Sequence, residues 1–189
     1  MSQQTVKEAV LATVEAIRND AAMAKVRYKA QTQWEEDVRC TGRVRDFDPM
    51  VIDEPPAFGG GDSAVSPADV VLVALGTCQE IMYVALASTM DIPLDEVKVD
   101  VTADLDLNGL MGLDPETPPG LLEMSYDVRI KSPAPVEDLK RLVDTVEYQC
   151  PLLDTLTRSV KVTGKVKLND AVDYVGAGSY VDQRMRKSA

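Results

Sequence analysis

Histidine is absent from this chain of 189 residues. Its absence excludes Ser-His-Asp and Cys-His catalysis, as well as the zinc sites that combine histidine with cysteine. Cysteine is scarce, because Cys40, Cys78 and Cys150 lie far apart and form no C-x-x-C pair. This spacing excludes a thioredoxin-type motif and a zinc knuckle, and an odd number of thiols argues against a disulfide framework. Any catalysis must therefore use single thiols, carboxylates, Arg, Lys or Tyr.

Positive charge is also in short supply. The 20 Lys and Arg residues face 31 Asp and Glu residues, so the formal net charge is −11. This balance argues against nucleic acid and anionic membranes as partners, because both require clustered cations. No apolar run reaches about 20 residues without polar breaks, and residues 1–4 lack a basic-then-apolar signal pattern. We expect a single well-cored domain in the cytoplasm.

The most informative stretch is residues 66–90, SPADVVLVALGTCQEIMYVALASTM. Ser66 is a suitable N-cap, Pro67 is tolerated at the first helical position, and Asp69 completes an S-x-x-D capping box. The following residues 70–75 are apolar on every side of a helix, which is typical of an interior helix. The pattern therefore predicts a buried central helix.

This helix contains a glycine and a thiol in its middle. Gly76 weakens a helix by about 1 kcal/mol relative to alanine, so its presence predicts that another element packs closely there. Cys78 follows two residues later. Helical spacing surrounds this thiol with mostly apolar side chains.

The rest of the chain alternates between strand-like and helix-like patterns. An amphipathic helix is expected over residues 5–25 and a second one over 136–149. Loops are expected at 58–63 and 108–120, where glycine and proline gather. The fold class is therefore α+β, with strands expected at residues 28–34, 38–45, 50–52, 97–107, 124–130 and 160–168.

The three thiols have different surroundings. Cys40 shares strand parity with apolar neighbours, which favours a small buried residue. Cys150 precedes Pro151. It either closes the preceding helix, where the helix dipole disfavours a thiolate, or caps a short helix that begins at Pro151, where the dipole favours one. The sequence leaves both alternatives open.

Cys78 lies in mid-helix, so a reactive thiolate there needs a cation from another element. Three arginines of the early strands could supply it, because Arg39, Arg43 and Arg45 lie on the face opposite Cys40. The same arginines are equally consistent with a solvated polar face.

SPADVVLVALGTCQE, followed later by YQCPLLDTL at the end of a helix, resembles the OsmC/Ohr family of osmotically inducible and organic hydroperoxide resistance proteins. YKAQTQWEEDVR, VIDEPPAFGGGD and IPLDEVKVDV extend the resemblance. It suggests an N-terminal helical extension (1–26), an OsmC-like domain (27–168) and a C-terminal tail (169–189). The resemblance implies curved antiparallel sheets around two central helices in an intertwined homodimer, with sites near the dimer interface.

The resemblance also implies an activity. Family members look like thiol-dependent peroxidases that act on organic hydroperoxides in oxidative stress and use an external dithiol as reductant, with no metal or other cofactor. On that pattern Cys78 matches the peroxidatic cysteine, Cys150 the resolving cysteine and Arg39 the arginine that lowers the pKa of the attacking thiol. A Cys78–Cys150 disulfide would close the oxidative half of the cycle.

One position departs from this pattern. Hydroperoxidase members usually carry a glutamate that orients the arginine where this chain has Ala68. Asp69 is a possible carboxylate partner, although it also suits the helix cap, and Glu54 is a more distant one. An alternative is therefore a non-catalytic dimer on the same fold that binds a small molecule or senses redox state, with the 108–120 loop as a lid. A third interpretation gives the thiols a purely structural role.

Overall fold

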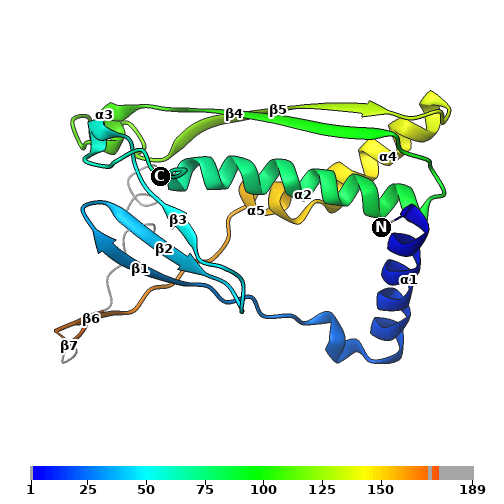
Figure 1. Ribbon diagram of the computed structural model, residues 1–189, viewed down its shortest axis with the longest axis horizontal. Coiled ribbons are helices and arrows are strands. Elements are labelled where there is room, and N and C mark those ends of the chain that lie inside the picture. Colours follow the sequence, from blue (N-terminus) through cyan, green and yellow to red (C-terminus); the bar gives the residue numbers. More distant parts are fainter. Residues whose placement is uncertain (1, 170–171, 175–189) are drawn as a thin grey trace. The chain divides into compact units, whose positions relative to one another are not determined.

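The computed structural model describes residues 2–169 and 172–174 (Figure 1). The chain divides into two compact units, residues 1–154 and 155–189, and each is considered by itself. The helices of the first unit are α1 (Gln3–Asn19), α2 (Pro67–Thr89), α3 (Leu107–Leu110) and α4 (Val136–Gln149), with short 3-10 turns η1 (Ala21–Ala24) and η2 (Pro56–Phe58). Its strands are β1 (Gln31–Glu36), β2 (Arg39–Arg43), β3 (Met50–Ile52), β4 (Glu96–Leu105) and β5 (Leu121–Lys131).

Helix α5 (Pro151–Thr157) begins in the first unit and ends in the second, which also contains the antiparallel pair β6 (Val166–Leu168) and β7 (Val172–Tyr174). The first unit holds two separate sheets. Strands β1, β2 and β3 form an antiparallel sheet in that order, and β4 pairs with β5 in a long antiparallel ribbon. Figure 1 shows this ribbon running alongside α2. The predicted α+β class is confirmed.

Helix α2 begins as the sequence predicts. The Ser66 side chain accepts a hydrogen bond from the Asp69 backbone N–H, and the Asp69 carboxylate accepts one from the Ser66 N–H, so the capping box is complete. A Cβ atom at Gly76 would lie 3.3 Å from Val101 Cγ2 and 3.7 Å from the Val99 carbonyl oxygen. The close approach predicted at Gly76 is therefore confirmed, and its partner is β4.

The core lies between α2, α4 and the turn that leads into β4. On α2 the buried residues Leu75, Gln79 and Tyr83 recur at a spacing of four, so they share one side of the helix. The central cluster of the core is Tyr83, Ala87, Ile92, Leu142 and Val146. Burial of these side chains on both helices fixes how α2 and α4 pack against each other.

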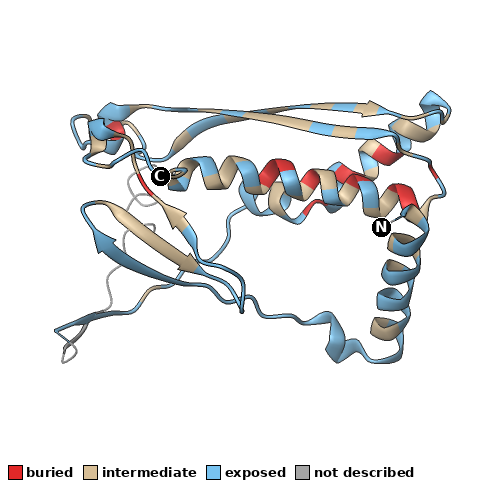
Figure 2. Cartoon of the chain, viewed as in Figure 1, coloured by how far each residue is buried: buried red, intermediate tan, exposed pale blue. Residues whose placement is uncertain are grey.

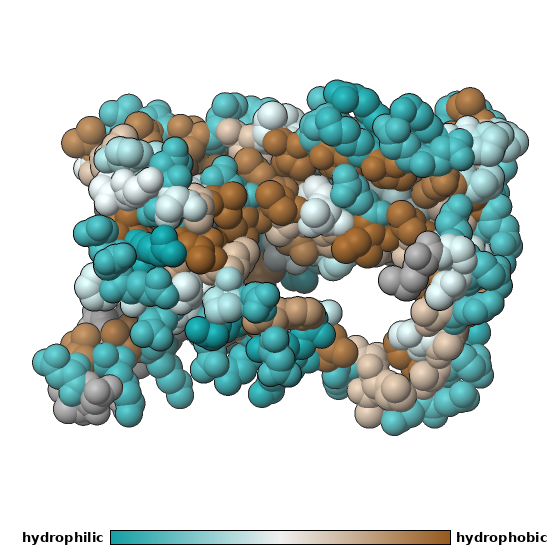
Figure 3. All heavy atoms as spheres, in the orientation of Figure 1, coloured by the Kyte–Doolittle hydropathy of each residue, from teal (hydrophilic) through white to brown (hydrophobic). Residues whose placement is uncertain are grey.

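The opposite side of α2 is not buried, which corrects the prediction of an interior helix. Val73, Ile81 and Val84 are 58%, 67% and 37% exposed and lie on one face of the helix. Figure 2 shows exposed positions along the helix, and Figure 3 shows hydrophobic residues gathered over it. Helix α2 is long and apolar enough to cross a membrane, judged by length and composition alone. The core helix of a folded domain meets the same two criteria.

Helix α1 ends earlier than predicted. Asp20 stops it at Asn19, because the Asp20 carboxylate accepts a hydrogen bond from the Ala22 N–H and caps η1 instead. The first turn of α1 is attached to the segment between α2 and β4, where the Gln3 amide donates to the Ile92 carbonyl oxygen and accepts from the Leu94 N–H.

Other element limits also differ from the sequence prediction. The 108–120 loop starts inside α3, and the last predicted strand shortens to β6. The first strand runs from Gln31 to Glu36, later in the chain than predicted. Of the predicted 169–189 tail, residues 170–171 and 175–189 lie outside the described residues.

The loop between β3 and α2 is organised around a buried carboxylate. Asp53 is 2% exposed. Its oxygens accept hydrogen bonds from the backbone N–H groups of Glu54, Gly61 and Ser63, and from the Ser63 hydroxyl at 2.7 Å. These donors, led by the Ser63 hydroxyl, lower the pKa of Asp53 to about 2, since they stabilise the charged form. The glycine-rich loop predicted at 58–63 is therefore held by a specific anchor.

The contact at Gly76 leads to a first prediction. Gly76→Leu forces a large side chain against Val99 and Val101, so we expect the free energy of unfolding to fall by about 1–3 kcal/mol. Gly76→Ala gains helix propensity of about 1 kcal/mol, which offsets the tight contact of a single methyl group. Urea unfolding of both variants measures the difference, and equal stability of the leucine variant and the wild type would contradict the close packing.

The Asp53 anchor leads to a second prediction. Its folded pKa of about 2 lies below the unfolded value of about 3.9. The carboxylate therefore stabilises the fold above about pH 4, and this contribution is lost as the pH falls toward about 2. Asp53→Asn should lower the melting temperature at neutral pH, and the gap to the wild type should narrow over that acidic interval. Asp62→Asn in the same loop is the control. A gap that is independent of pH would show that the Asp53 charge is not responsible.

Candidate functional site

Two of the predicted site residues meet at the junction of α2, α4 and α5. The Cys150 thiol donates to Cys78 Sγ, and the two sulfur atoms are 3.8 Å apart. Both cysteines are free, since a disulfide requires a separation of about 2.05 Å. Cys150 is fully buried and Cys78 is partly exposed. The structure thus brings together two thiols that are distant in the sequence, one within α2 and the other between α4 and α5.

The backbone around Cys150 explains its position. Its N–H donates to the Val146 carbonyl oxygen and closes α4, while its own carbonyl oxygen accepts from the Asp154 N–H in α5. Proline at position 151 cannot continue α4, because it lacks an N–H and clashes with the preceding turn. The sequence left open whether Cys150 closes α4 or precedes a short helix at Pro151. In the structure it does both.

Within a single chain the surroundings of Cys78 oppose its ionisation. Burial raises the pKa of this thiol above its ordinary value. The backbone N–H of Leu152 acts in the opposite direction, because it hydrogen bonds the charged sulfur, and the neighbouring Cys150 thiol raises the pKa further. A reactive thiolate at Cys78 therefore needs an additional positive group.

Arg39 on β2 is held elsewhere. Its Nη1 donates to the Ser63 hydroxyl at 3.0 Å, and its Nε lies 3.4 Å from the Glu35 carboxylate. The Ser63 hydroxyl in turn donates to the buried Asp53 carboxylate. Among the described residues no recorded interaction joins Arg39 to either Cys78 or Cys150. The structure therefore positions the arginine firmly but does not bring it to the thiols of its own chain.

Asp69 and the third cysteine, Cys40, have local roles. The Asp69 carboxylate is engaged by the Ser66 N–H and hydroxyl, which lower its pKa, so its recorded partners belong to the helix cap. Cys40 is half-buried and its thiol donates to the Val38 carbonyl oxygen. Thus Ser63 and Asp53, which the sequence did not single out, occupy the place next to Arg39 for which Asp69 was one possible carboxylate.

Sequence reasoning also missed a polar group near Cys150. The Tyr126 hydroxyl donates to Glu147 Oε1 at 3.2 Å, and this bond joins β5 to α4. Tyr83 is 1% exposed, and burial, reinforced by the Glu147 charge, raises its pKa to about 12. Glu147 is one helical turn before Cys150, a spacing visible in the sequence, but only the fold places Tyr126 beside it.

A separate hollow of about 350 Å³ lies between α1 and the end of α2. Its lining includes Gln3, Lys7, Ser88 and Asp91 but neither Cys78 nor Cys150. Lys7 and Asp91 form an ion pair across it. The thiol pair is therefore a distinct feature of the domain.

Comparison with solved structures places the fold among known proteins. An OsmC-like protein from Mycoplasma pneumoniae aligns with a TM-score of 0.61 and 22% identity, over 70% of this chain and 89% of that one. An organic hydroperoxide resistance protein OsmC from Legionella pneumophila aligns with a TM-score of 0.54 and 16% identity, over 69% and 89%. An OsmC-like protein from Vibrio cholerae aligns with a TM-score of 0.56 and 10% identity, over 69% and 94%.

These structures confirm the predicted OsmC-like fold. No curated protein matches the sequence of this chain. The family model described as OsmC-like protein matches residues 59–165, more than half of the chain, and this range contains both cysteines of the thiol pair. The chain belongs to the OsmC-like family.

Proposed function

We propose that this protein is a cysteine-dependent peroxidase that reduces organic hydroperoxides. The observation that carries the proposal is the 3.8 Å contact between Cys78 Sγ and Cys150 Sγ, because it joins an attacking thiol and a resolving thiol with little movement. The name of the Legionella pneumophila neighbour, an organic hydroperoxide resistance protein, points to the same substrate class.

The reaction divides into two steps on this chain. The Cys78 thiolate attacks one peroxide oxygen, the O–O bond breaks, and the alcohol leaves with a proton while Cys78 becomes a sulfenic acid. Cys150 then attacks the sulfenic sulfur, so a disulfide forms and water leaves. An external dithiol reduces the disulfide and restores both thiols.

The surroundings of Cys78 favour an apolar substrate. Leu75 and Met82 lie on the same side of α2 at helical spacing from Cys78, and Leu75 is buried. Apolar walls attract an alkyl group, since burying it releases hydration water. They offer little to hydrogen peroxide, which is small and polar.

We further propose that the active form is a homodimer. The exposed face of α2, with Val73, Ile81 and Val84, would be buried by a second copy at a gain of about 25 cal/mol per Å². Burial of this face would complete the central helix that the sequence predicts. In such a dimer, Arg39 of one copy could approach Cys78 of the other and lower its pKa.

The raised pKa of Cys78 and the alanine at position 68 favour a second candidate function. A thiol pair without an activating cation could still close slowly into a disulfide and serve as a redox sensor. The two functions differ in turnover, because a sensor consumes one equivalent of oxidant and then stops.

The thiol pair leads to a third prediction. With cumene hydroperoxide and excess dithiothreitol, Cys78→Ser should lower turnover to the uncatalysed rate, because no sulfenic acid can form. After one equivalent of peroxide without reductant, intact mass should show a disulfide in the wild type and one added oxygen in Cys150→Ser. Cys40→Ser is the matched control and should behave as the wild type.

Two other outcomes of this assay have clear meanings. Wild-type turnover by Cys78→Ser would exclude the proposed peroxidase. A wild-type protein that forms the disulfide but does not turn over would favour the redox sensor.

The proposed dimer leads to a fourth prediction. Ile81→Asp places a charge in the middle of the exposed α2 face, so light scattering should show a monomer and peroxidase turnover should fall with it. Val136→Asp is the control, because Val136 is similarly exposed at 65% but lies at the start of α4, where an acidic residue suits the helix dipole. A wild-type monomer, or an Ile81→Asp variant that remains dimeric, would contradict the assignment of this face.

A further inference from the structure

Gln79, the residue after Cys78, is a buried polar side chain without a good partner. It is 1% exposed. Neither its amide nitrogen nor its amide oxygen makes a hydrogen bond of good geometry among the described residues. An unsatisfied buried polar group costs about 1–3 kcal/mol, whereas leucine of similar size would avoid that cost. Positions that break a local rule in this way are often functional, so the neighbours of Gln79 are of interest.

These neighbours come from three elements, α2, β5 and α4. The Gln79 amide lies beside the hydroxyl of Tyr126 on β5 without a hydrogen bond of good geometry, and that hydroxyl donates to Glu147 Oε1 on α4. Tyr83, one turn after Gln79 on α2, is buried and responds to the charges of Glu147 and Cys150. The polar cluster is therefore Gln79, Tyr83, Tyr126 and Glu147.

Glu147 is the only carboxylate in this cluster, and its position relates it to one of the two thiols. It lies three residues before Cys150, which is one turn of α4. It is exposed, so the carboxylate can exchange protons with water. Burial raises the pKa of Tyr126, and the charges of Glu147 and Cys150 raise it further. Tyr126, which holds Glu147, therefore lies near Cys150 as well.

We propose that Glu147, held in place by Tyr126 and Gln79, accepts the Cys150 proton in the resolving step. The inference rests on the proposed peroxidase function and deepens it. As Cys150 sulfur attacks the sulfenic sulfur of Cys78, its proton passes to the Glu147 carboxylate and the S–S bond forms. The S–O bond breaks, and the leaving hydroxide takes a proton from the protonated Glu147 to become water. Cys150 sulfur is oxidised, the sulfenic sulfur is reduced, and Glu147 ends unchanged.

A purely structural role for the cluster predicts something different. The Tyr126–Glu147 hydrogen bond also ties β5 to α4, so its loss could lower stability without altering chemistry. The lifetime of the sulfenic acid separates the two roles, because a structural tie does not determine how fast Cys150 resolves it. Tyr126 and Gln79 are positioning residues in this scheme, and Gln79→Leu is informative because it should stabilise the fold while slowing resolution.

The experiment follows the two half-reactions separately. Reduced full-length protein is mixed with one equivalent of cumene hydroperoxide, quenched over time with dimedone, and analysed by intact mass. For Glu147→Gln we expect sulfenic acid to form at the wild-type rate and the disulfide to form on the order of 100-fold more slowly, which is typical for loss of a general base. Tyr126→Phe and Gln79→Leu should slow disulfide formation by smaller factors, and Gln79→Leu should raise the melting temperature.

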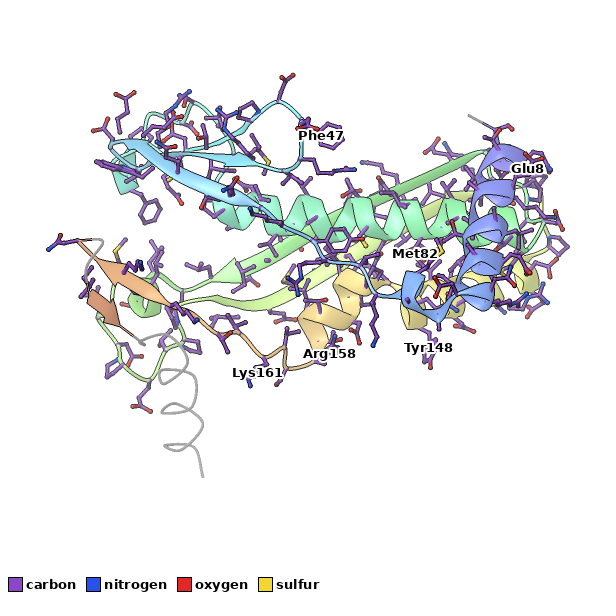
Figure 4. The ribbon with its side chains drawn as sticks, turned by 90° about the horizontal axis from the view of Figure 1, so that it is seen from below. Glu8, Phe47, Met82, Tyr148, Arg158 and Lys161 are labelled. Carbon is purple, nitrogen blue, oxygen red and sulfur yellow. The ribbon has the colours of Figure 1, made fainter. Side chains whose placement is uncertain are left out.

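Matched controls come from the same helix. Glu137→Gln removes a carboxylate that pairs with Lys140, and Tyr148→Phe removes the hydroxyl of a tyrosine that is 87% exposed and points away from α2 (Figure 4). Both should resolve at the wild-type rate. Disulfide formation by Glu147→Gln at the wild-type rate would overturn the role of Glu147 and leave the peroxidase standing. Absence of both the sulfenic acid and the Cys78–Cys150 disulfide in the wild type would instead overturn the peroxidase itself.

Discussion

The close packing of α2 against β4 and α4 is the constraint on which the candidate site depends. Gly76 lets the helix approach Val101 within van der Waals contact, and the buried cluster around Leu142 and Val146 holds α4 against the same helix. Cys78 lies half a turn after Gly76, and Cys150 lies one turn after Val146. Close-packed interiors transmit small volume changes, so the 3.8 Å distance between the two sulfur atoms is set by packing several residues away.

A second constraint holds the cation. Arg39 is linked through the Ser63 hydroxyl to the buried carboxylate of Asp53, and its other face is paired with Glu35. The Ser63 hydroxyl accepts from the guanidinium and donates to the carboxylate, so it connects the two charged groups, and Glu35 adds a direct ion pair. The alanine at position 68 therefore does not leave Arg39 without an anchor. This anchor holds Arg39 against the loop that contains Asp53 and Ser63 and against Glu35 on β1.

Much of this fold follows from sequence patterns. The capping box of α2 and the limits of β3 and α4 depend on neighbours within a few residues, so local rules suffice for them. Glycine in mid-helix indicates a close approach at Gly76, but only the fold shows that the partner is β4. The end of α1 was misplaced because Asp20 serves a second cap, and competing caps have similar energies.

The features that the sequence missed depend on distant contacts. The exposed face of α2 is apolar. Its sequence would be the same if this chain or a second copy covered it, so the hydrophobic periodicity cannot tell which of the two would do so. The bond from Tyr126 to Glu147 joins residues 21 positions apart on different elements. The donors of Asp53 likewise come together only when the loop folds back over the carboxylate. The proximity of Cys78 and Cys150 was expected from the family resemblance and not from either residue's own surroundings.

The surroundings of Cys78 relate the reactivity of its thiol to the proposed pairing of two chains. A single chain places Cys78 where burial raises its pKa, keeps Arg39 on a separate sheet, and leaves an apolar face of the same helix exposed. Each of these costs would be relieved by one event, the burial of that face against a second copy that also carries a positioned arginine. A thiol that ionises only within the assembled protein is protected from oxidation in the isolated chain. Under the proposed function, the packing of α2 would therefore control both the stability of the domain and the state in which its thiol reacts.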